Sequence, residues 1–481
     1  MKKVPVSSAR VKVGFKGIVT TTAEEVLGWE FSPETYNFRF EDGMLKGNIG
    51  VENAKGHYAS VPGAGFDYPA LPSGVTVKDV FVYTRRHDGE YDDRLILQCT
   101  DGSLYYTKIF SGTPWTKIDT QYLLLGDATA VNYNYDGNDV LLLSSASCQL
   151  AVLNDTTLKA VPDAPRLSSL AVHYERVYGT QNEYENKVWF SDDFNPENWT
   201  VASDAAGYVS FADECGDALA VVSFLNYLYI FREHGIFRLT AYGDQQDFSL
   251  KKLFTGTGRI YKNTIALCGD RIMFLTDDGV MTFDGYDVRP AVKELPELAS
   301  AYRCMGAYHD GCYFLLCTTA VRPELSVDDT PGYNNTVVRY SIKDGATDML
   351  TAGYFFTMRA CRTHTACDLL LASTNPPDGK LGMLSKRGEY FGTPLKKLYR
   401  TPCNDLSVDK FKIIRSVNVT TMSDLELTVI TDDRKKTYTV KGSSLPQTVF
   451  VDRGGKKVGL ELRSSMMYAE IAPLTVNLDF M

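Results

Sequence analysis

Three pairs of neighbouring carboxylates are the residues best suited by type to catalysis in this chain. They are Asp192-Asp193, Asp277-Asp278 and Asp328-Asp329. A glycosidase needs two carboxyl groups about 5–9.5 Å apart, one on each side of the reacting sugar. Hairpin turns also favour Asp, because its side chain hydrogen-bonds the local backbone. We therefore interpret the three pairs as turn residues.

The histidines and cysteines do not follow a metal-binding pattern. His234 and His309 stand at expected hairpin corners, where a polar residue is normal. The spacings Cys312-x4-Cys317 and Cys361-x5-Cys367 differ from those of structural zinc ligands. Many cysteines lie within apolar strand runs, so we expect reduced, buried thiols in a protein made in a cytoplasm. The six histidines are His57, His87, His173, His234, His309 and His364, and the ten cysteines are Cys99, Cys148, Cys215, Cys268, Cys304, Cys312, Cys317, Cys361, Cys367 and Cys403.

Motifs for nucleophilic catalysis, zinc proteolysis and phosphate binding are missing from the sequence. It contains no Gly-x-Ser-x-Gly elbow, no His-Glu-x-x-His and no Gly-x4-Gly-Lys-Ser/Thr loop. The calcium spacing Asp-x-Asp-x-Asp-Gly is also missing. Gly256-Thr257-Gly258 precedes Arg259, but no helix is expected to follow, so a turn between sheets is favoured. The sequence thus predicts no catalytic, cofactor-binding or metal-binding residue and no cofactor.

Residues 172–200 form the most distinctive segment. It reads as a strand, a polar turn, a second strand that ends at Ser191-Asp192, and a turn that begins at Asn195-Pro196. Trp199 is expected to fold back over this hairpin as a hydrophobic plug. The alternative for Trp199 is an aromatic surface on which a sugar stacks.

Repeated hairpins are the elements that must position these residues. Apolar residues alternate in residues 224–231, the corner Glu233-His234-Gly235 reverses the chain, and residues 236–240 return. The same order recurs in residues 272–283 around Asp277-Asp278-Gly279. The chain also contains 29 Tyr and 24 Phe residues, and aromatic residues favour strands. Successive hairpins of this kind predict a radially repeated all-β fold.

Further corners extend this pattern along the chain. They recur at steps of roughly 40 to 60 residues, close to the length of a four-stranded propeller blade. We predict a six- or seven-bladed β-propeller; a chain of β-sandwiches or stacked sheets is the alternative. The other corners are Asp101-Gly102, Ala146-Ser147, the strand that starts at Lys187, Lys343-Asp344-Gly345 and Arg387-Gly388.

Three regions are expected along the chain. Residues 1–55 are extended, with a hairpin at Asp42-Gly43, and residues 56–400 form the propeller. In residues 401–481 apolar residues alternate strictly, as in Leu425, Leu427 and Val429, which gives each strand one buried face and one face in contact with water. We predict a C-terminal antiparallel β-sandwich or sheet domain there.

The composition indicates a globular protein without a broad affinity for polyanions. The 481 residues carry a formal net charge of −9, whereas general nucleic-acid binders are more often basic. The start, MKKVPVSSARVKVGFKG, lacks the apolar stretch of a secretory signal. No run of about 18 apolar residues occurs, so no transmembrane helix and no membrane-spanning contact are expected.

Three segments resemble β-propeller virion proteins of tailed bacteriophages. RVYGT, NKVWFSD and NPENW in residues 176–199 match one recurring segment of those proteins. SFLNYLYIFREHGIFRLTAYGD in residues 223–244 is similar to their next strand pair, and YNFRFEDGMLKGNIG in residues 36–50 to their N-terminal segment. Together these segments resemble the tail-stabilisation or tail-hub family, the portal-to-tail adaptors of short-tailed phages. The chain lacks a recognisable helical portal-binding tail.

The resemblance implies a structural virion protein, not an enzyme, in the neck or tail of a phage assembled in the host cytoplasm. Its partners would be portal or neck proteins and other tail proteins. It implies a homo-oligomeric ring of about six or twelve copies with heterologous contacts. An acidic ring lumen would let DNA pass without specific binding, with Arg85-Arg86 and Lys435-Lys436 as isolated cationic sites. The alternatives are a carbohydrate-binding or glycan-degrading propeller, such as a receptor-binding tail component, and a general interaction propeller of a bacterial cell.

Overall fold

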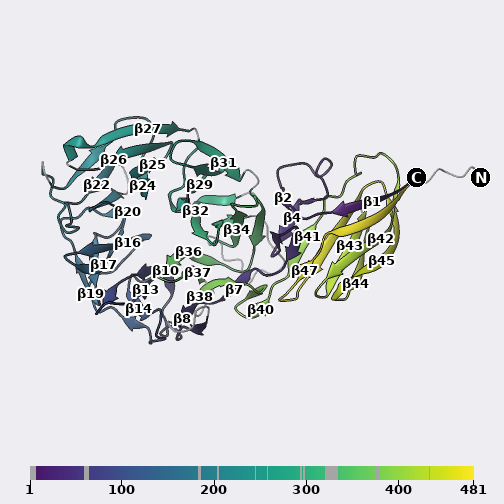
Figure 1. Ribbon diagram of the computed structural model, residues 1–481, viewed down its shortest axis with the longest axis horizontal. Helices are drawn as coiled ribbons and strands as arrows, with labels where there is room; N and C mark the ends of the chain where they lie inside the picture. The colour runs from purple at the N-terminus through teal and green to yellow at the C-terminus, as the bar shows by residue number, and fades with distance from the viewer. Residues whose placement is uncertain are drawn as a thin grey trace, which may run out of the picture.

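The structure consists of a ring of β-sheets with a β-sandwich beside it (Figure 1). It is a computed structural model that describes residues 7–58, 64–181, 186–202, 205–243, 245–256, 258–292, 295, 298–319, 334–373, 380–432 and 434–481. Within these ranges the helical segments are two short 3-10 turns, η1 (Gln245–Asp247) and η2 (Lys262–Thr264). None of the described helices has the length and hydrophobicity that crossing a membrane requires.

The ring contains six sheets of four strands and one sheet of six strands, so the chain forms a seven-bladed β-propeller. Neighbouring strands within a blade are antiparallel and follow one another along the chain, apart from the last blade. Blade 1 contains β10 (Val77–Tyr83), β13 (Arg94–Cys99), β14 (Leu104–Lys108) and β15 (Thr116–Lys117). Blade 2 contains β16 (Ala128–Tyr135), β17 (Asn138–Ser145), β18 (Ala151–Asn154) and β19 (Thr157–Ala160). Blade 3 contains β20 (Leu167–His173), β21 (Arg176–Gln181), β22 (Lys187–Phe190) and β23 (Gly207–Ser210). Blade 4 contains β24 (Ala218–Phe224), β25 (Tyr227–Arg232), β26 (Gly235–Thr240) and β27 (Ser249–Thr255). Blade 5 contains β28 (Ala266–Leu267), β29 (Ile272–Thr276), β30 (Gly279–Phe283) and β31 (Val288–Val292). Blade 6 contains β32 (Leu298–His309), β33 (Cys312–Thr319), β34 (Thr336–Ser341) and β35 (Thr347–Leu350).

Hydrophobic side chains fill the space between neighbouring blades. One buried cluster lies at each of the seven blade contacts, including the contact of blade 7 with blade 1 that closes the ring. Between blades 4 and 5, for example, the rings of Phe231 and Phe274 meet edge to face with centroids 5.4 Å apart. Since each sheet buries both faces against its neighbours, the strands are apolar on both sides. The repeat of these contacts sets the blade number at seven.

A strand from the beginning of the chain completes blade 7. The first three strands are β36 (Phe355–Arg362), β37 (Cys367–Ser373) and β38 (Leu381–Ser385), and β7 (Gly50–Asn53) pairs antiparallel with β38. Val51 of β7 is fully buried in the cluster between blades 6 and 7. Two short strands, β39 (Glu389–Tyr390) and β40 (Thr393–Pro394), extend the same sheet. The ring is therefore closed by backbone hydrogen bonds between the two ends of the propeller sequence.

The sandwich combines C-terminal strands with four strands from the N-terminal segment. The segment 1–55, expected as one extended region, thus supplies β7 to the propeller and β1, β4, β5 and β6 to the sandwich. β41 also pairs in the sandwich and ends at Arg400, directly before the expected boundary. The seven-stranded sheet contains β1 (Ser7–Val13), β5 (Arg39–Glu41), β6 (Met44–Lys46), β42 (Lys412–Thr421), β45 (Ser443–Gly455), β47 (Glu470–Ile471) and β48 (Leu474–Phe480), and the five-stranded sheet contains β4 (Glu34–Tyr36), β41 (Lys397–Arg400), β43 (Leu425–Thr431), β44 (Arg434–Val440) and β46 (Val458–Ser464). The remaining short pairs are β2 (Gly17–Ile18) with β3 (Phe31–Ser32), β8 (Lys55–His57) with β9 (Gly65–Asp67), and β11 (Arg86–His87) with β12 (Glu90–Tyr91).

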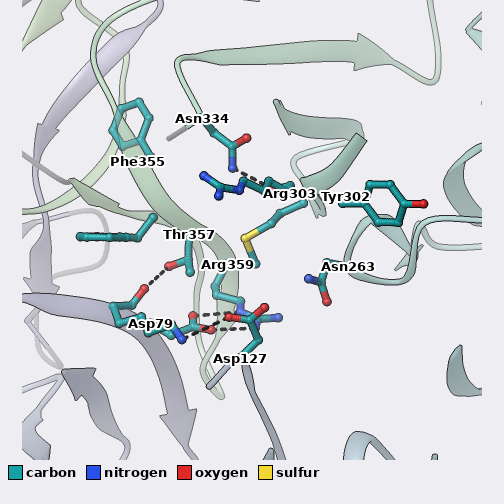
Figure 2. Close-up of a pocket in the computed structure, with 12 residues that line it drawn as sticks. Asp79, Asp127, Asn263, Tyr302, Arg303, Asn334, Phe355, Thr357 and Arg359 are labelled. Atoms are coloured by element: carbon teal, nitrogen blue, oxygen red, sulfur yellow. Dashed lines mark hydrogen bonds and ion pairs between the residues drawn. The ribbon is translucent and has the colours of Figure 1, made fainter. Parts of the chain in front are cut away.

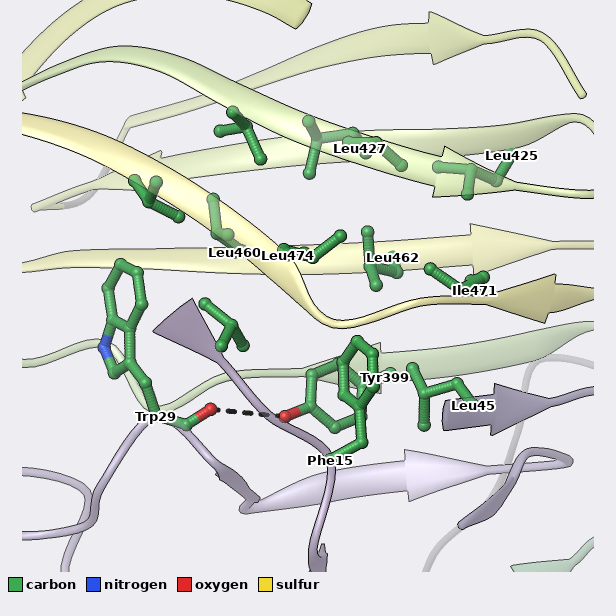
Figure 3. Close-up of a cluster of buried hydrophobic side chains, with 14 of the residues drawn as sticks. Phe15, Trp29, Leu45, Tyr399, Leu425, Leu427, Leu460, Leu462, Ile471 and Leu474 are labelled. Atoms are coloured by element: carbon green, nitrogen blue, oxygen red, sulfur yellow. Dashed lines mark hydrogen bonds between the residues drawn. The ribbon is translucent and has the colours of Figure 1, made fainter. Parts of the chain in front are cut away.

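The sandwich has its own hydrophobic core between the two sheets (Figure 3). Leu427 and Leu462 of the five-stranded sheet are fully buried, as the alternation in the sequence predicted. The prediction that the opposite face of these strands contacts water is wrong, because Ile430 and Glu461 on that face are buried as well. Tyr399 lies beside Phe15, with ring centroids 5.0 Å apart and planes at 87°. The hydroxyl of Tyr399 donates a hydrogen bond to the carbonyl oxygen of Trp29 at 3.4 Å. N-terminal side chains are therefore part of this core.

Asn37 fixes the N-terminal segment to both blade 6 and the strand that leaves the propeller. Its side-chain amide donates to the carbonyl oxygens of Thr351 at 3.1 Å and Lys396 at 2.8 Å. Its side-chain oxygen accepts from the backbone N–H of Thr351 at 2.8 Å, and its own N–H donates to Met349 at 2.8 Å. Asn37 is completely buried and has a positive φ of 59°, a conformation that Asn tolerates better than most residues. This one side chain links the two domains.

The predicted hairpin turns at residues 42–43, 233–235 and 277–279 are confirmed. Glu41 pairs with Met44 around Asp42-Gly43, Arg232 with Gly235 around Glu233-His234, and Thr276 with Gly279 around Asp277-Asp278. The corner predicted at Arg387-Gly388 is not a hairpin turn, because β7 lies between β38 and β39 in the sheet. The corners at residues 343–345 and 387–388 follow the third strand of a blade, whereas the two at residues 233–234 and 277–278 follow the second. The ten cysteines are free thiols, and seven of them are buried.

Candidate functional site

The blade topology defines two faces of the propeller. We call the side on which the first strand of each blade begins the start face, and the side on which it ends the end face. Because strands alternate in direction, turns between the second and third strands lie on the start face. Turns between the first and second strands, and after the third, lie on the end face. This rule assigns each candidate residue to one face.

A pocket of about 220 Å³ lies among the first strands of blades 6, 7 and 1, near the start face (Figure 2). It is formed mainly by blades 6, 7 and 1, and it contains both cations and carboxylates. The residues around it are Lys78, Asp79, Asp127, Asn263, Tyr302, Arg303, Met305, Asn334, Phe355, Phe356, Thr357 and Arg359.

Most of the charged side chains in this pocket form ion pairs with each other, between neighbouring blades. Arg359 of blade 7 donates to both carboxylate oxygens of Asp79 of blade 1, at 3.0 and 2.7 Å (Figure 2). Lys78 pairs with Asp127 at 3.2 Å and donates to the carbonyl oxygen of Gly126 at 2.6 Å. Burial disfavours the charged form of Arg359, but the carboxylate of Asp79 more than offsets this, so the pKa of Arg359 is raised. These ion pairs therefore tie blade 7 to blade 1, and blade 1 to the chain entering blade 2.

Lys262 of η2 lies close to this network. Desolvation by burial lowers the pKa of Lys262 to about 8; the carboxylate of Asp127 opposes that shift, and the guanidinium of Arg359 adds to it. The side chain is thus partly neutral at a pH near 8. No group of three or more His, Cys, Asp or Glu side chains in the described part of the chain is arranged to hold a metal ion.

The acidic pairs singled out in the sequence do not come together. Asp192-Asp193 follow the third strand of blade 3 and lie on the end face, whereas Asp277-Asp278 lie on the start face of blade 5. Asp328-Asp329 fall outside the described residues. Two carboxylates on opposite faces of a disc cannot flank one sugar. The local contacts fit turn residues: Asp277 accepts hydrogen bonds from the N–H of Arg259 and the hydroxyl of Tyr261.

Trp199 is buried, with 2% of its surface exposed, in the cluster between blades 2 and 3. Its indole N–H donates to the carbonyl oxygen of Pro196 at 2.8 Å. The plug interpretation is therefore confirmed, and sugar stacking on Trp199 is ruled out. His234 is confirmed as a turn residue between β25 and β26, and His309 ends β32 directly before its turn. Gly256 and Gly258 lie in the connection between blades 4 and 5, also as predicted.

One residue of each cationic site noted in the sequence has a carboxylate close by, whereas Arg86 contacts Tyr91 and Lys436 lies over the ring of Tyr438. Arg85 pairs with Asp155 and lies 3.7 Å from Asp92. Lys435 of the edge strand β44 lies 3.6 Å from Glu461.

Two histidine–carboxylate pairs lie where the ring closes. Nε2 of His57, just beyond β7, is 2.6 Å from a carboxylate oxygen of Asp368 in blade 7. Nδ1 of His364, between β36 and β37, is 2.7 Å from Asp93 of blade 1, and its ring stacks on Tyr91 at 3.9 Å. The hydrogen bond to Asp368 raises the pKa of His57, although burial opposes this.

We expect this pairing to make the ring closure sensitive to pH. The folded-state pKa of His57 lies above its unfolded value of about 6.5. The protonated His57–Asp368 pair therefore stabilises the folded state fully below about pH 6.5, and this stabilisation is lost as the pH rises through the folded-state pKa. His173 and His309 act in the opposite sense, because burial lowers the pKa of each. Replacing His57→Gln and comparing urea unfolding of both proteins at several pH values isolates the His57 contribution. The variant should lose more stability at acidic than at basic pH; an equal loss at every pH contradicts the pairing.

A group of large side chains exposed on the end face of blades 3 to 5 was not predicted from the sequence. They occupy turns in which small or polar residues are usual. Their exposed fractions are 47% for Tyr174, 72% for Phe194, 53% for Leu225, 70% for Tyr242 and 69% for Tyr286. A large apolar residue directly between two strand runs, as in HYER and FLNY, was the available signal. We call these five residues the aromatic face.

The comparisons with known proteins leave the family of the chain open. No protein-family model matches it, and no curated protein matches it. Similar solved structures include BBS1N in complex with ARL6DN, soaked with lead, which is 9% identical, has a TM-score of 0.43 and covers 65% of this chain and 93% of its own. The Neurospora crassa Pan2 WD40 domain is 12% identical, has a TM-score of 0.40 and covers 66% of this chain and 97% of its own. The assignment of a propeller fold rests on the strand pairings within the chain itself.

Proposed function

We propose that this protein is a structural adaptor of a tailed-bacteriophage particle, which forms a ring between the portal or neck and the tail. The resemblance of residues 36–50, 176–199 and 223–244 to phage tail-hub propellers supports the phage assignment. In this role the protein binds other proteins and a neighbouring copy, carries out no reaction, and lets DNA pass. Its net charge of −9 fits the last point.

The observation that carries the adaptor role is the way the N-terminal segment builds both domains. β7 completes the propeller, while β1, β4, β5 and β6 are strands of the sandwich. The hydrogen bonds of Asn37 and the buried strands between the two domains prevent independent motion of the propeller and the sandwich. The protein thus presents two chemically different ends at a fixed spacing, which is what a part joining two neighbours requires.

The sandwich offers an edge at which a neighbouring copy can bind. Among the described strands β45 pairs only with β42, so its other side is open. Two large apolar residues of β45 are strongly exposed: Leu445 at 71% and Phe450 at 77%. Edge strands of this kind are ready to pair with another chain unless they are protected. β44, the edge of the other sheet, carries Arg434, Lys435 and Lys436 and is protected by charge.

Light-scattering mass measurement, with and without a candidate portal ring, tests the proposal. We expect a monomer that becomes a defined ring of about six or twelve copies on the portal. Phe450→Lys should weaken ring formation by at least about tenfold, because it places a charge in the contact. Val26→Lys is the matched control: Val26 is 76% exposed but lies outside β45. A protein that ignores the portal, and instead binds or cleaves a capsular or cell-wall glycan, would contradict the adaptor role and favour the carbohydrate alternative.

A further inference from the structure

The aromatic face is one continuous surface, although its residues come from five separate turns. The rings of Tyr174 and Tyr242 lie 5.5 Å apart, edge to face. The hydroxyl of Tyr174 donates to the carbonyl oxygen of Asn226 at 3.4 Å, next to Leu225. Leu225 in turn lies against Gly285, the neighbour of Tyr286. On the other side, the N–H of Phe194 donates to the carbonyl oxygen of Glu175 at 3.1 Å.

Three of these exposed side chains stand on strained backbone. φ is 51° at Tyr174, 53° at Phe194 and 47° at Leu225. The left-handed region disfavours residues that carry a Cβ, and turns normally place Gly, Asn or Asp there. Since these side chains remain exposed, burial does not compensate for the strain. Backbone strain combined with apolar exposure is a mark of a binding site rather than of a stabilising contact.

The charge around the aromatic face is negative. Three nearby carboxylates, those of Glu175, Asp192 and Asp247, form no ion pair among the described residues, and a fourth, Asp284, interacts only at longer range with Arg289. The backbone N–H groups of Asp287 and Tyr286 lower the pKa of Asp284, so this side chain is anionic at neutral pH. The other carboxylates of these turns are already paired, Asp193 with Arg176 and Asp287 with Arg289.

We infer that the aromatic face binds an arginine- or lysine-rich segment of a partner protein. The exposed rings accept cations over their faces, and arginine combines that contact with planar stacking. The unpaired carboxylates provide charge complementarity, which steers a basic segment to this face. A purely apolar partner would bury these carboxylates without compensation, and a polyanion would be repelled. This inference holds whether or not the protein belongs to a phage.

Fluorescence anisotropy with short labelled peptides tests this binding site. The probe alternates glycine and arginine over seven residues, and its control carries glutamine in place of arginine. We expect the arginine peptide to bind, the glutamine peptide not to bind, and the affinity to fall as salt is added. Tyr242→Ala should weaken binding by about two- to fivefold, whereas Tyr242→Phe, which retains the ring, should bind as the wild type does.

Matched variants separate this site from general attraction to an acidic protein. Tyr302, 66% exposed beside the pocket of blades 6, 7 and 1, is a similarly exposed aromatic residue away from the aromatic face. Tyr302→Ala should leave peptide binding unchanged, and Tyr286→Ala should weaken it, as a second variant on the aromatic face. Equal losses for Tyr242→Ala and Tyr302→Ala would overturn the inference. Binding of a neutral oligosaccharide, but not of the arginine peptide, that is lost with Tyr242→Ala would overturn it in favour of a glycan site.

Discussion

Replacing Asn37→Ala should lower the free energy of unfolding by about 3 kcal/mol. The variant loses four side-chain hydrogen bonds and leaves the N–H, hydroxyl and carbonyl of Thr351 and the carbonyl of Lys396 without those partners in a fully buried site. Each unsatisfied buried group costs about 1–3 kcal/mol, although relaxation recovers part of this. Alanine also tolerates the positive φ of 59° less well than asparagine. Urea unfolding followed by circular dichroism measures the loss.

Two controls separate the contributions at Asn37. Asn37→Gly removes the same hydrogen bonds without backbone strain, so it should be less damaging than Asn37→Ala by about 1 kcal/mol. Asn226 also has a positive φ, of 61°, but stands in an exposed turn. Asn226→Ala should therefore cost only about 1 kcal/mol. If Asn37→Ala costs no more than Asn226→Ala, the side chain does not fix the two domains as described.

Replacing Arg339→Ala should be at least as damaging, with a loss of about 3–5 kcal/mol. Nε of Arg339 lies 3.1 and 3.0 Å from the carboxylate oxygens of Asp348, and a terminal nitrogen lies 2.5 Å from one of them. The Asp348 side chain is completely buried in blade 6, and burial raises its pKa despite the guanidinium. Without Arg339, the buried carboxylate keeps only a hydrogen bond from the backbone of Phe40 and a longer-range interaction with Arg39. The measurement is again urea unfolding at neutral pH.

The pH dependence of this variant gives a second readout. In Arg339→Ala the pKa of Asp348 should rise further above its unfolded value, so the folded state binds the proton more tightly. The free energy of unfolding of the variant should then fall as the pH rises. The difference in this free energy between wild type and variant should be smaller under mildly acidic conditions than at neutral pH. The double variant Arg339→Met with Asp348→Asn removes both charges and should be more stable than Arg339→Ala alone. A double variant as unstable as the single one would show that packing, not the unpaired charge, causes the loss.

Local sequence pattern was sufficient for the hairpins and for the fold class. The turns at Asp42-Gly43, Glu233-His234 and Asp277-Asp278 were predicted from residues within about ten positions of each other, because turn type and strand alternation depend on nearby residues. Trp199 was likewise assigned correctly to packing. The alternation of Leu425, Leu427 and Val429 identified one buried strand face, as the sandwich shows.

The site could be predicted only in part. The acidic pairs at residues 192–193 and 277–278 were correctly interpreted as turn residues, yet nothing local showed that they lie on opposite faces. The aromatic face was missed, because its five residues are far apart in sequence and only the ring brings their turns together. The ion pair between Asp79 and Arg359 in the pocket joins residues 280 positions apart and has no local signal either.

The sequence by itself determined an all-β chain of short hairpins, a propeller of six or seven blades and a C-terminal β domain. Only the tertiary structure decided that there are seven blades, that β7 closes the ring, and that β1, β4, β5 and β6 belong to the sandwich. The physical reason is that turns and side-chain alternation are fixed by neighbouring residues. The pairing of a strand edge depends instead on which distant strand offers a complementary edge and a hydrophobic face when the whole chain is packed. The seven clusters between blades and the buried Asn37 junction make that choice unique.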